Sequence, residues 1–348
     1  MAELKTKPTK ASVAAFLEEV DERGYYDIRN RTALEVDGEG NKTSVKVDMR
    51  DISGDVTVLG AHRGGTHRHE YSRDGKRIGF TYDDFLVRDY DRTIGFMQPD
   101  ENAPEGYTHY FSVILKPAKM GKSKAGEIEK AYGDSWVDAA GTMRAFIGKV
   151  RAKNGTDYEN DLFVAHIPAD IDITTSFAGR QDQYPEPPEG ITLRRLTHGW
   201  DVSGILRGSS DRSQIAFVAR DGDGINQLFV TNAVGSDKET IQVTNLRSPV
   251  SSIRWHPSGE WVFFISDGNL FVTYVGTRLR YGKTLKLSDD RLIRDQLVVS
   301  PDGTLLAYVM PVPTKDGSGT IVKDANGNDF RQIFTMELDW KRLDDASK

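Results

Sequence analysis

The chain has 348 residues, 38% of them hydrophobic and 28% charged, which is a composition typical of soluble globular proteins. Its formal net charge of −6 argues against a general nucleic-acid binder, because such proteins usually neutralise phosphates with a basic surface. The chain has no cysteine, which excludes disulfides and fits a reducing compartment. No apolar stretch reaches the length of a signal peptide core or a membrane span. We therefore expect a cytoplasmic protein with no nucleic-acid or membrane partner.

The N-terminal segment has the spacing of a helix. Apolar residues between positions 11 and 23 recur at three- and four-residue intervals, with acidic residues between them and Gly24 at the end. This predicts a helical extension over residues 1–25. Two alternating runs at residues 33–36 and 44–47 follow, separated by a glycine-rich turn, and predict paired outer strands.

Residues 64–84 form the most informative stretch of the chain. An alternating run leads into a turn of the Ser-x-Asp-Gly type at residues 72–75, and a second alternating run follows. This order predicts two paired strands joined by a tight turn. The first strand carries His67 and His69, the only His-x-His in the chain.

This hairpin pattern recurs downstream at residues 209–217, 256–264 and 300–308. The first residues of these copies are 47 and 44 positions apart, and the gap back to Ser72 is about three such steps. A repeat of this length with a strand-turn-strand core is typical of four-stranded propeller blades. The copies are rich in β-branched and aromatic residues, which excludes helical repeats of similar length.

Further strands are predicted between and after these copies. Alternating or apolar runs indicate strands at residues 109–115, 145–150, 161–167, 227–231, 269–273 and 332–338. Residues 127–132 have a helical spacing and predict a helix. We expect one propeller over residues 26–340, followed by a tail at residues 341–348.

The Ser-Pro-Asp-Gly turn at residues 300–303, the Leu-Phe-Val strands and the Leu-Thr pair at residues 196–197 resemble those of TolB-like β-propellers. A narrower resemblance, to the YidR-type family of bacterial propeller proteins, covers the chain from about residue 26 to near its end. It rests on segments 64–69, 126–132, 145–148, 187–190, 194–197 and 255–261. The resemblance implies an all-β, TolB-like propeller of four-stranded blades, about five of them recognisable.

The chain departs from that family at its start, where family members usually carry further blades before the position of Tyr26. The resemblance therefore implies a shorter ring, an open ring, or a ring that a partner closes. An uncovered blade edge offers unpaired N–H and C=O groups to another chain. Self-association, or a partner that closes an open blade edge, is expected on this ground.

The candidate site is centred on His67 and His69, which we predict to share one face of their strand because they lie two residues apart. When the copies are aligned on the turn, His69 falls level with the aliphatic residues Leu206, Ile253 and Leu297. A histidine in an aliphatic position indicates a function, as a metal ligand or a polar anchor for a ligand. The alternative is a pair of structural histidines bonded to a neighbouring blade.

Other residues near this stretch extend the candidate site. Arg63 could bind a carboxylate through paired donors, although such an arginine is often only a solvated loop charge. The predicted ligand-binding set is Arg63, His67, His69, Glu70, Tyr82 and Asp83, and the catalytic candidates are His67, His69 and Arg63. A metal needs more than two donors, and His62, His109 or His198 are the candidates to complete such a set around His67 and His69.

Two functional classes follow from these residues. One is a binding module whose channel holds an anionic carbohydrate or another small molecule, or a scaffold for protein partners. The other is an enzyme: TolB-like propellers are related to oligogalacturonate lyases, and the resemblance implies a divalent metal (Mn, Zn or Ca) that assists elimination across a uronate. The sequence favours the binding module, and fold alone does not choose between them.

Overall fold

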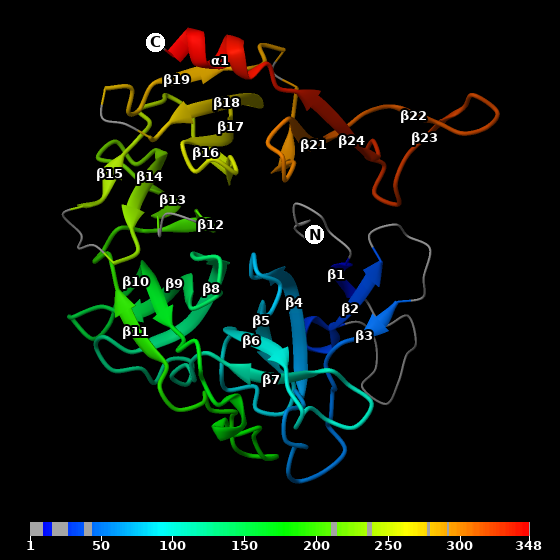
Figure 1. Cartoon of the computed structure of the whole chain (residues 1–348), viewed down its shortest axis with the longest axis vertical. Helices are drawn as coiled ribbons and strands as arrows, with labels where there is room; N and C mark the ends of the chain where they lie inside the picture. Colours follow the sequence, from blue (N-terminus) through cyan, green and yellow to red (C-terminus); the bar gives the residue numbers. More distant parts are fainter. Residues whose placement is uncertain are drawn as a thin grey trace. The chain divides into compact units, whose positions relative to one another are not determined.

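A computed structural model describes residues 10–15, 27–37, 44–209, 214–234, 239–276, 279–290 and 292–347. In this part of the chain the structure is almost entirely β, with one α-helix, α1 (Trp340–Ser347), and two short 3-10 helices, η1 (Ile28–Asn30) and η2 (Ile173–Thr175) (Figure 1). None of the described helices combines the length and the apolar character needed to cross a membrane.

The chain divides into two compact units. Unit 1 comprises residues 1–215 and 232–239, and unit 2 comprises residues 216–231 and 240–348.

Unit 1 contains three antiparallel sheets and one further inner strand. The first sheet is three-stranded and the other two are four-stranded meanders. Their strands are β1 (Lys10–Ala15), β2 (Thr32–Asp37) and β3 (Val45–Lys46); β4 (Gly64–Tyr71), β5 (Ile78–Asp84), β6 (Thr93–Pro99) and β7 (His109–Val113); and β8 (Ile128–Trp136), β9 (Met143–Arg151), β10 (Tyr158–His166) and β11 (Thr192–Arg195), with β12 (Ser203–Gly208) as the further strand.

The remaining strands, together with β12, make up two four-stranded sheets, one three-stranded sheet and a small hairpin. Their strand orders are β12-β13-β14-β15, β16-β17-β18-β19, β20-β21-β24 and β22-β23. Their bounds are β13 (Gln214–Arg220), β14 (Asn226–Asn232), β15 (Ile241–Gln242), β16 (Val250–Trp255), β17 (Trp261–Ser266), β18 (Asn269–Tyr274), β19 (Thr284–Lys286), β20 (Asp295–Val299), β21 (Leu305–Pro311), β22 (Thr314–Lys315), β23 (Ile321–Val322) and β24 (Arg331–Glu337).

The repeated hairpin predicted from the sequence is confirmed as the core of the blades. At Ser72 the backbone N–H donates to the carbonyl of Arg77 at 2.8 Å, and Gly75 takes a φ of 76°. The turn at Ser300 repeats this geometry, with its N–H on the carbonyl of Leu305 at 2.9 Å and Gly303 at a φ of 77°. Glycine is suited to both turns because a Cβ disfavours a positive φ. Five blade sheets begin at β4, β8, β12, β16 and β20, in agreement with the predicted number.

Two helix predictions are wrong. Residues 10–15 form strand β1, which pairs antiparallel with β2, and the rest of the predicted N-terminal helix lies outside the described residues. Residues 128–136 form strand β8, where Glu129 and Ala131 are buried and their neighbours are half-buried. Pairing with β9 along the whole of β8 outweighs the weak local helical pattern.

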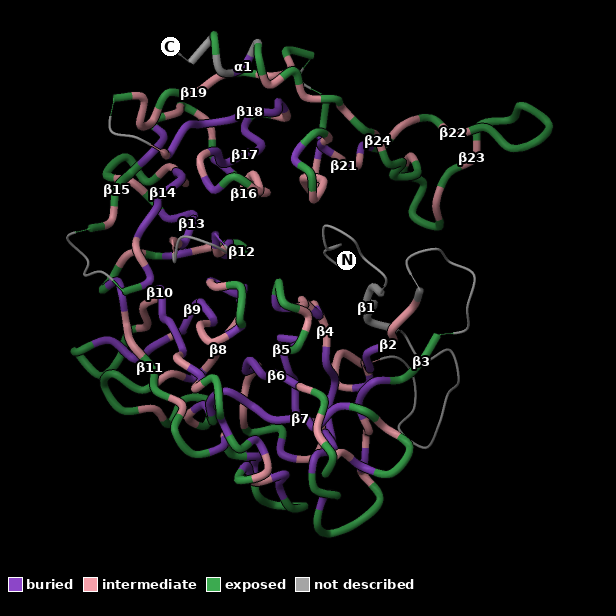
Figure 2. Tube along the Cα trace, viewed as in Figure 1, coloured by how far each residue is buried: buried purple, intermediate pink, exposed green. Residues whose placement is uncertain are grey.

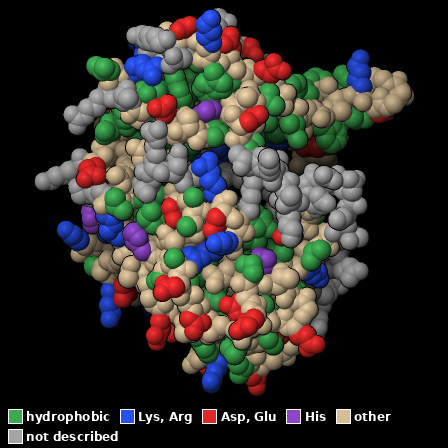
Figure 3. All heavy atoms as spheres, viewed as in Figure 1, with side chains coloured by type: hydrophobic (Ala, Val, Ile, Leu, Met, Phe, Trp, Pro, Cys, Tyr) green, Lys and Arg blue, Asp and Glu red, His purple; other side chains and the backbone are tan. Residues whose placement is uncertain are grey.

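Each unit has its own apolar core. In unit 1 one cluster centres on Phe96, Phe146 and Phe163, and a second on Phe80, Tyr82 and Phe111. Figure 2 shows that most residues of β5, β6 and β9 are buried, whereas the connecting loops are largely exposed. In unit 2 one cluster includes Trp261 and Phe263, together with Leu343 of α1. Acidic and basic side chains are interspersed over the face seen in Figure 3.

Candidate functional site

The strand that carries the two predicted histidines is interrupted by a β-bulge. His67 pairs with Thr81 and Glu70 with Gly79, so that Arg68 and His69 together lie opposite Phe80. Arg68 has a φ of 58°, in the left-handed region that non-glycine residues rarely adopt. Because paired residues point to the same face of a sheet, His67 lies on the face of Thr81 and His69 on that of Phe80. The prediction that the two imidazoles share one face is therefore wrong.

Every inner blade strand contains one residue with a positive φ. These residues are Arg68 in β4, Gly133 in β8, Gly204 in β12, Ser252 in β16 and Gln296 in β20. In four of these strands, all but β12, the register shift identifies a bulge, and the residues that follow the left-handed one are His69, Asp134, Ile253 and Leu297, all buried. The predicted equivalence of His69 with aliphatic residues is thus seen in β16 and β20. In β8, the inner strand of the next blade, the polar residue Asp134 occupies the position equivalent to His69.

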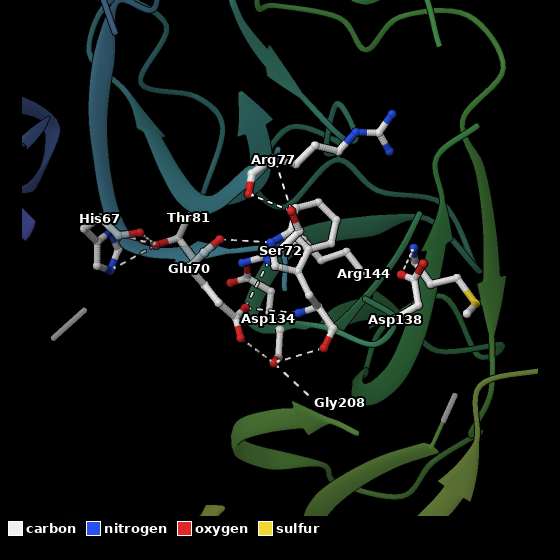
Figure 4. Close-up of polar contacts among 12 residues, drawn as sticks. His67, Glu70, Ser72, Arg77, Thr81, Asp134, Asp138, Arg144 and Gly208 are labelled. Carbon is white, nitrogen blue, oxygen red and sulfur yellow. Dashed lines mark hydrogen bonds and ion pairs between the residues drawn. The ribbon is translucent and has the colours of Figure 1, made fainter. Parts of the chain in front are cut away.

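His67 is half-buried and bonded to the neighbouring strand. The hydroxyl of Thr81 lies 2.7 Å from its Nδ1 (Figure 4). Burial and the positive charges of Arg92, Arg31 and Arg68 lower the pKa of His67 to about 2. The imidazole is therefore neutral at physiological pH and acts as a hydrogen-bonding group.

His69 is buried in a largely apolar environment. Only 3% of the residue is exposed, its ring lies 6.0 Å from that of Phe80, and neither ring nitrogen has a hydrogen-bond partner among the described residues. Burial is the main cause that lowers the pKa of His69 to about 3. The imidazole of His69 is therefore neutral at physiological pH and closed off from solvent.

Glu70 and Asp134 converge on one buried arginine, Arg144 of β9 (Figure 4). The Arg144 Nε donates to Asp134 Oδ2 at 2.7 Å, and its Nη1 donates to Glu70 Oε2 at 3.1 Å. The guanidinium also lies over the ring of Trp136, 4.6 Å from the ring centroid. Glu70 accepts further bonds from the Ser135 hydroxyl and the Trp136 N–H. These contacts join the blade of β4 to the blade of β8.

Arg68 lies beside this network and is not neutralised by it. It is half-buried, and its guanidinium makes no hydrogen bond or ion pair with any residue that the structure describes. Burial and the nearby Arg207 of β12 lower the pKa of Arg68. The negative charges of Asp134 and Glu70 raise the pKa of Arg68, but both carboxylates already bind Arg144. We call Arg68, Arg207 and His67 the inner arginine site.

The predicted ligand residues Arg63 and Tyr82 are enclosed in the protein. Both have 0% of their surface exposed. The Arg63 Nε donates to Asp84 Oδ2 at 2.9 Å, its Nη1 donates to the carbonyl of Arg180, and the Tyr82 hydroxyl donates to Asp84 at 2.8 Å. Their partners are internal, which gives them a structural role in anchoring residues 180–184 to the blade. Asp83 is likewise buried and pairs with Arg92 at 3.0 Å.

The three further histidines lie in different settings. His62 is buried, with its Nε2 3.3 Å from Asp48 Oδ2 and its Nδ1 2.9 Å from the carbonyl of Gly64. His109 is buried with its Nδ1 2.8 Å from the hydroxyl of Thr108, whereas His198 is exposed after β11. Among the described residues, no group of three or more His, Asp or Glu side chains is arranged to hold a metal ion.

Sequence reasoning missed Arg68, Asp134 and Arg144. Arg68 stands between the two histidines, where strict alternation directs a side chain to the opposite face, and the bulge was not foreseen. Asp134 lies just after the helix predicted at residues 127–132, where no strand was predicted. The signal that could have found it is the pair Gly133-Asp134, where a glycine precedes a polar residue at the position equivalent to His69.

Comparison with known proteins gives one curated relative over most of the chain. The uncharacterized protein YidR of Escherichia coli (strain K12) is 30% identical over 323 residues, which cover 84% of this chain and 75% of the relative. A family model described as a protein of unknown function, DUF3748, matches residues 4–109.

Solved structures with the same fold include TolB from Acinetobacter baumannii and a prolyl endopeptidase. TolB is 13% identical with a TM-score of 0.50, and the match covers 94% of this chain and 64% of TolB. The prolyl endopeptidase is 12% identical with a TM-score of 0.51, and the match covers 97% of this chain and 40% of the enzyme. At these identities the likeness shows the β-propeller fold alone.

Proposed function

The chain belongs to the YidR family and has a TolB-like β-propeller fold, and from that premise we propose that it binds a small anionic ligand at the inner arginine site. The observation that carries the proposal is the half-buried guanidinium of Arg68, which lacks a described partner and lies near a second arginine. A buried charge is costly unless it is paired, so the site favours an anion that supplies the missing charge.

The chemistry of the site favours a planar carboxylate or a phosphate. A guanidinium offers parallel N–H donors that match two oxygens of such a group. His67 is neutral and can add one further hydrogen bond, for example to a sugar hydroxyl. A uronate, which carries a carboxylate on a sugar ring, combines both features. This agrees with the anionic carbohydrate expected from the sequence.

Three other arginines near β4 differ from Arg68, because each of them is paired with a carboxylate of the protein. Arg63 binds Asp84, Arg92 binds Asp83, and Arg144 binds both Asp134 and Glu70. Their charges are balanced inside the protein. Arg68 is the residue through which the site would bind a ligand, and Arg207 would strengthen the attraction.

The proposal is tested by titrating the purified protein with galacturonate and with inorganic phosphate, using isothermal calorimetry and glucose as a neutral probe. We expect an anion to bind and the Arg68→Gly variant to lose at least about tenfold in affinity, the size of a charged hydrogen bond. Glycine is chosen because it tolerates the positive φ at this position. Arg73→Ala is the matched control, since Arg73 is an exposed arginine in the turn of the same hairpin.

Two results would overturn the proposal. One is the absence of binding for both anions by the wild-type protein. The other is equal affinity of wild type and Arg68→Gly. His67 and His69, the metal ligands of the lyase alternative, lie on opposite faces of β4, so that alternative needs other donors.

A further inference from the structure

The last blade has an exposed edge where the other blades have a fourth strand. Its sheet is β20-β21-β24, whereas the four preceding blade sheets have four strands each. Within the described residues no strand pairs with the outer edge of β24. The residues that follow β24 do not supply it, because α1 packs elsewhere: Trp340 Nε1 donates to the carbonyl of Gly303 at 2.9 Å, and Leu343 lies in the core.

The edge of β24 is longer than the outer edges of the other blades. β24 has seven residues, whereas the fourth strands β7, β11, β15 and β19 have five, four, two and three. Short outer strands are one way in which proteins limit edge-to-edge pairing. β24 lacks this protection. It is mostly exposed, as Figure 2 shows, and Ile333 has 76% of its surface in solvent.

The backbone hydrogen bonds show which groups of β24 are free to pair. The N–H of Leu338 donates to Thr304, and the N–H of Val312 donates to Phe330, so the even-numbered residues around β24 bond toward β21. The odd-numbered residues therefore direct their N–H and C=O groups away from β21. These are Arg331, Ile333, Thr335 and Glu337.

We propose that β24 pairs antiparallel with β24 of a second copy of this chain, so that each strand completes the blade of the other. In a two-fold arrangement centred on Phe334, Arg331 lies opposite Glu337 of the second copy and Ile333 lies opposite Thr335. All four outward residues then form hydrogen-bonded pairs, and opposite charges meet at both ends. The exposed Ile333 is then flanked by Thr335 of the second copy.

The partner is a second copy because the edge is complementary to itself. Its charges are one arginine and one glutamate, placed symmetrically about Phe334, so that antiparallel self-pairing matches them twice. Arg331 also binds Asp295 in its own chain at 2.8 Å, but both side chains are about half exposed, and such a pair contributes little. None of these residues belongs to the inner arginine site.

The test is the molar mass in solution, measured by sedimentation velocity over a range of protein concentrations. We expect a dimer whose dissociation constant rises at least about tenfold in Arg331→Glu and in Glu337→Arg, because each change places like charges opposite each other twice. The double variant Arg331→Glu/Glu337→Arg exchanges the charges and should recover the dimer. Asp295→Ala is the matched control, since it removes the same intrachain ion pair without altering β24.

A backbone variant tests the hydrogen bonds directly. Thr335→Pro removes an outward N–H and leaves the bonds to β21 in place, so it should produce a folded monomer, with folding checked by circular dichroism. A monomeric wild-type protein at every concentration would overturn the proposal. So would a double charge variant that dimerises no better than the single ones. Protection of the outward amides of Ile333, Thr335 and Glu337 from hydrogen exchange in a monomer would show that this chain's own residues cover the edge, which also overturns the proposal.

Discussion

Arg144 offers the sharpest test of the contacts between the blades of β4 and β8. Its guanidinium is buried, and it pairs with Asp134 and Glu70, whose side chains are only 1% and 13% exposed. Arg144→Ala would leave both carboxylates without their cation. Removing one partner from a buried ion pair typically lowers the free energy of unfolding by about 3–5 kcal/mol.

Gly79 lies against the Arg144 guanidinium and allows an independent test of the same contact. A Cβ at this position would lie 2.1 Å from the Cζ of Arg144, although the backbone of Gly79 is ordinary strand. Gly79→Ala should therefore displace the guanidinium and reduce stability by about 1–3 kcal/mol, the usual range for overpacking. In the Arg144→Ala background the clash is gone, and the second substitution should cost less than about 0.5 kcal/mol.

The four proteins of this double-mutant cycle are compared by urea unfolding, followed by circular dichroism and by tryptophan fluorescence. Lys116→Ala is the control, because the Lys116–Glu186 pair at 2.7 Å is exposed and should contribute at most about 1 kcal/mol. A loss of less than about 1 kcal/mol in Arg144→Ala would show that the two carboxylates do not depend on Arg144. An equal cost of Gly79→Ala in both backgrounds would show that Gly79 does not contact the guanidinium.

Two further predictions concern stability. Burial raises the pKa of Asp48 from 3.8 to about 7, so the folded state holds a proton that the unfolded state releases. The free energy of unfolding should then fall as pH rises from about 4 to about 7, by up to about 4 kcal/mol, and urea titrations should show a flatter profile for Asp48→Asn. At the left-handed positions, Gly133→Ala should cost at least about 1 kcal/mol, because its Cβ would also meet the carbonyl oxygen of Gly204 at 2.7 Å. Ser252→Gly, at a φ of 50°, should stay within about 1 kcal/mol of wild type in the same assay; a larger loss would contradict the equivalence of the two positions.

The sequence by itself determined the blade repeat, because that repeat depends on local chemistry. The Ser-x-Asp-Gly turn and the alternation of apolar and polar residues on either side of it involve only about ten residues. The structure has strands at these positions. The family membership followed from the same segments. The strand β8 was missed because its local spacing resembles a helix, and only the partner strand β9 decides its conformation.

The tertiary structure decided which side chains meet. A single left-handed residue shifts the phase of a strand, and the residues that do this, Arg68, Ser252 and Gln296, share no side-chain type that a sequence could reveal. His67 and His69 were therefore assigned to one face although they lie on two. The convergence of Glu70 and Asp134 on Arg144 depends on the packing of two blades, and such long-range contacts leave no mark in local periodicity.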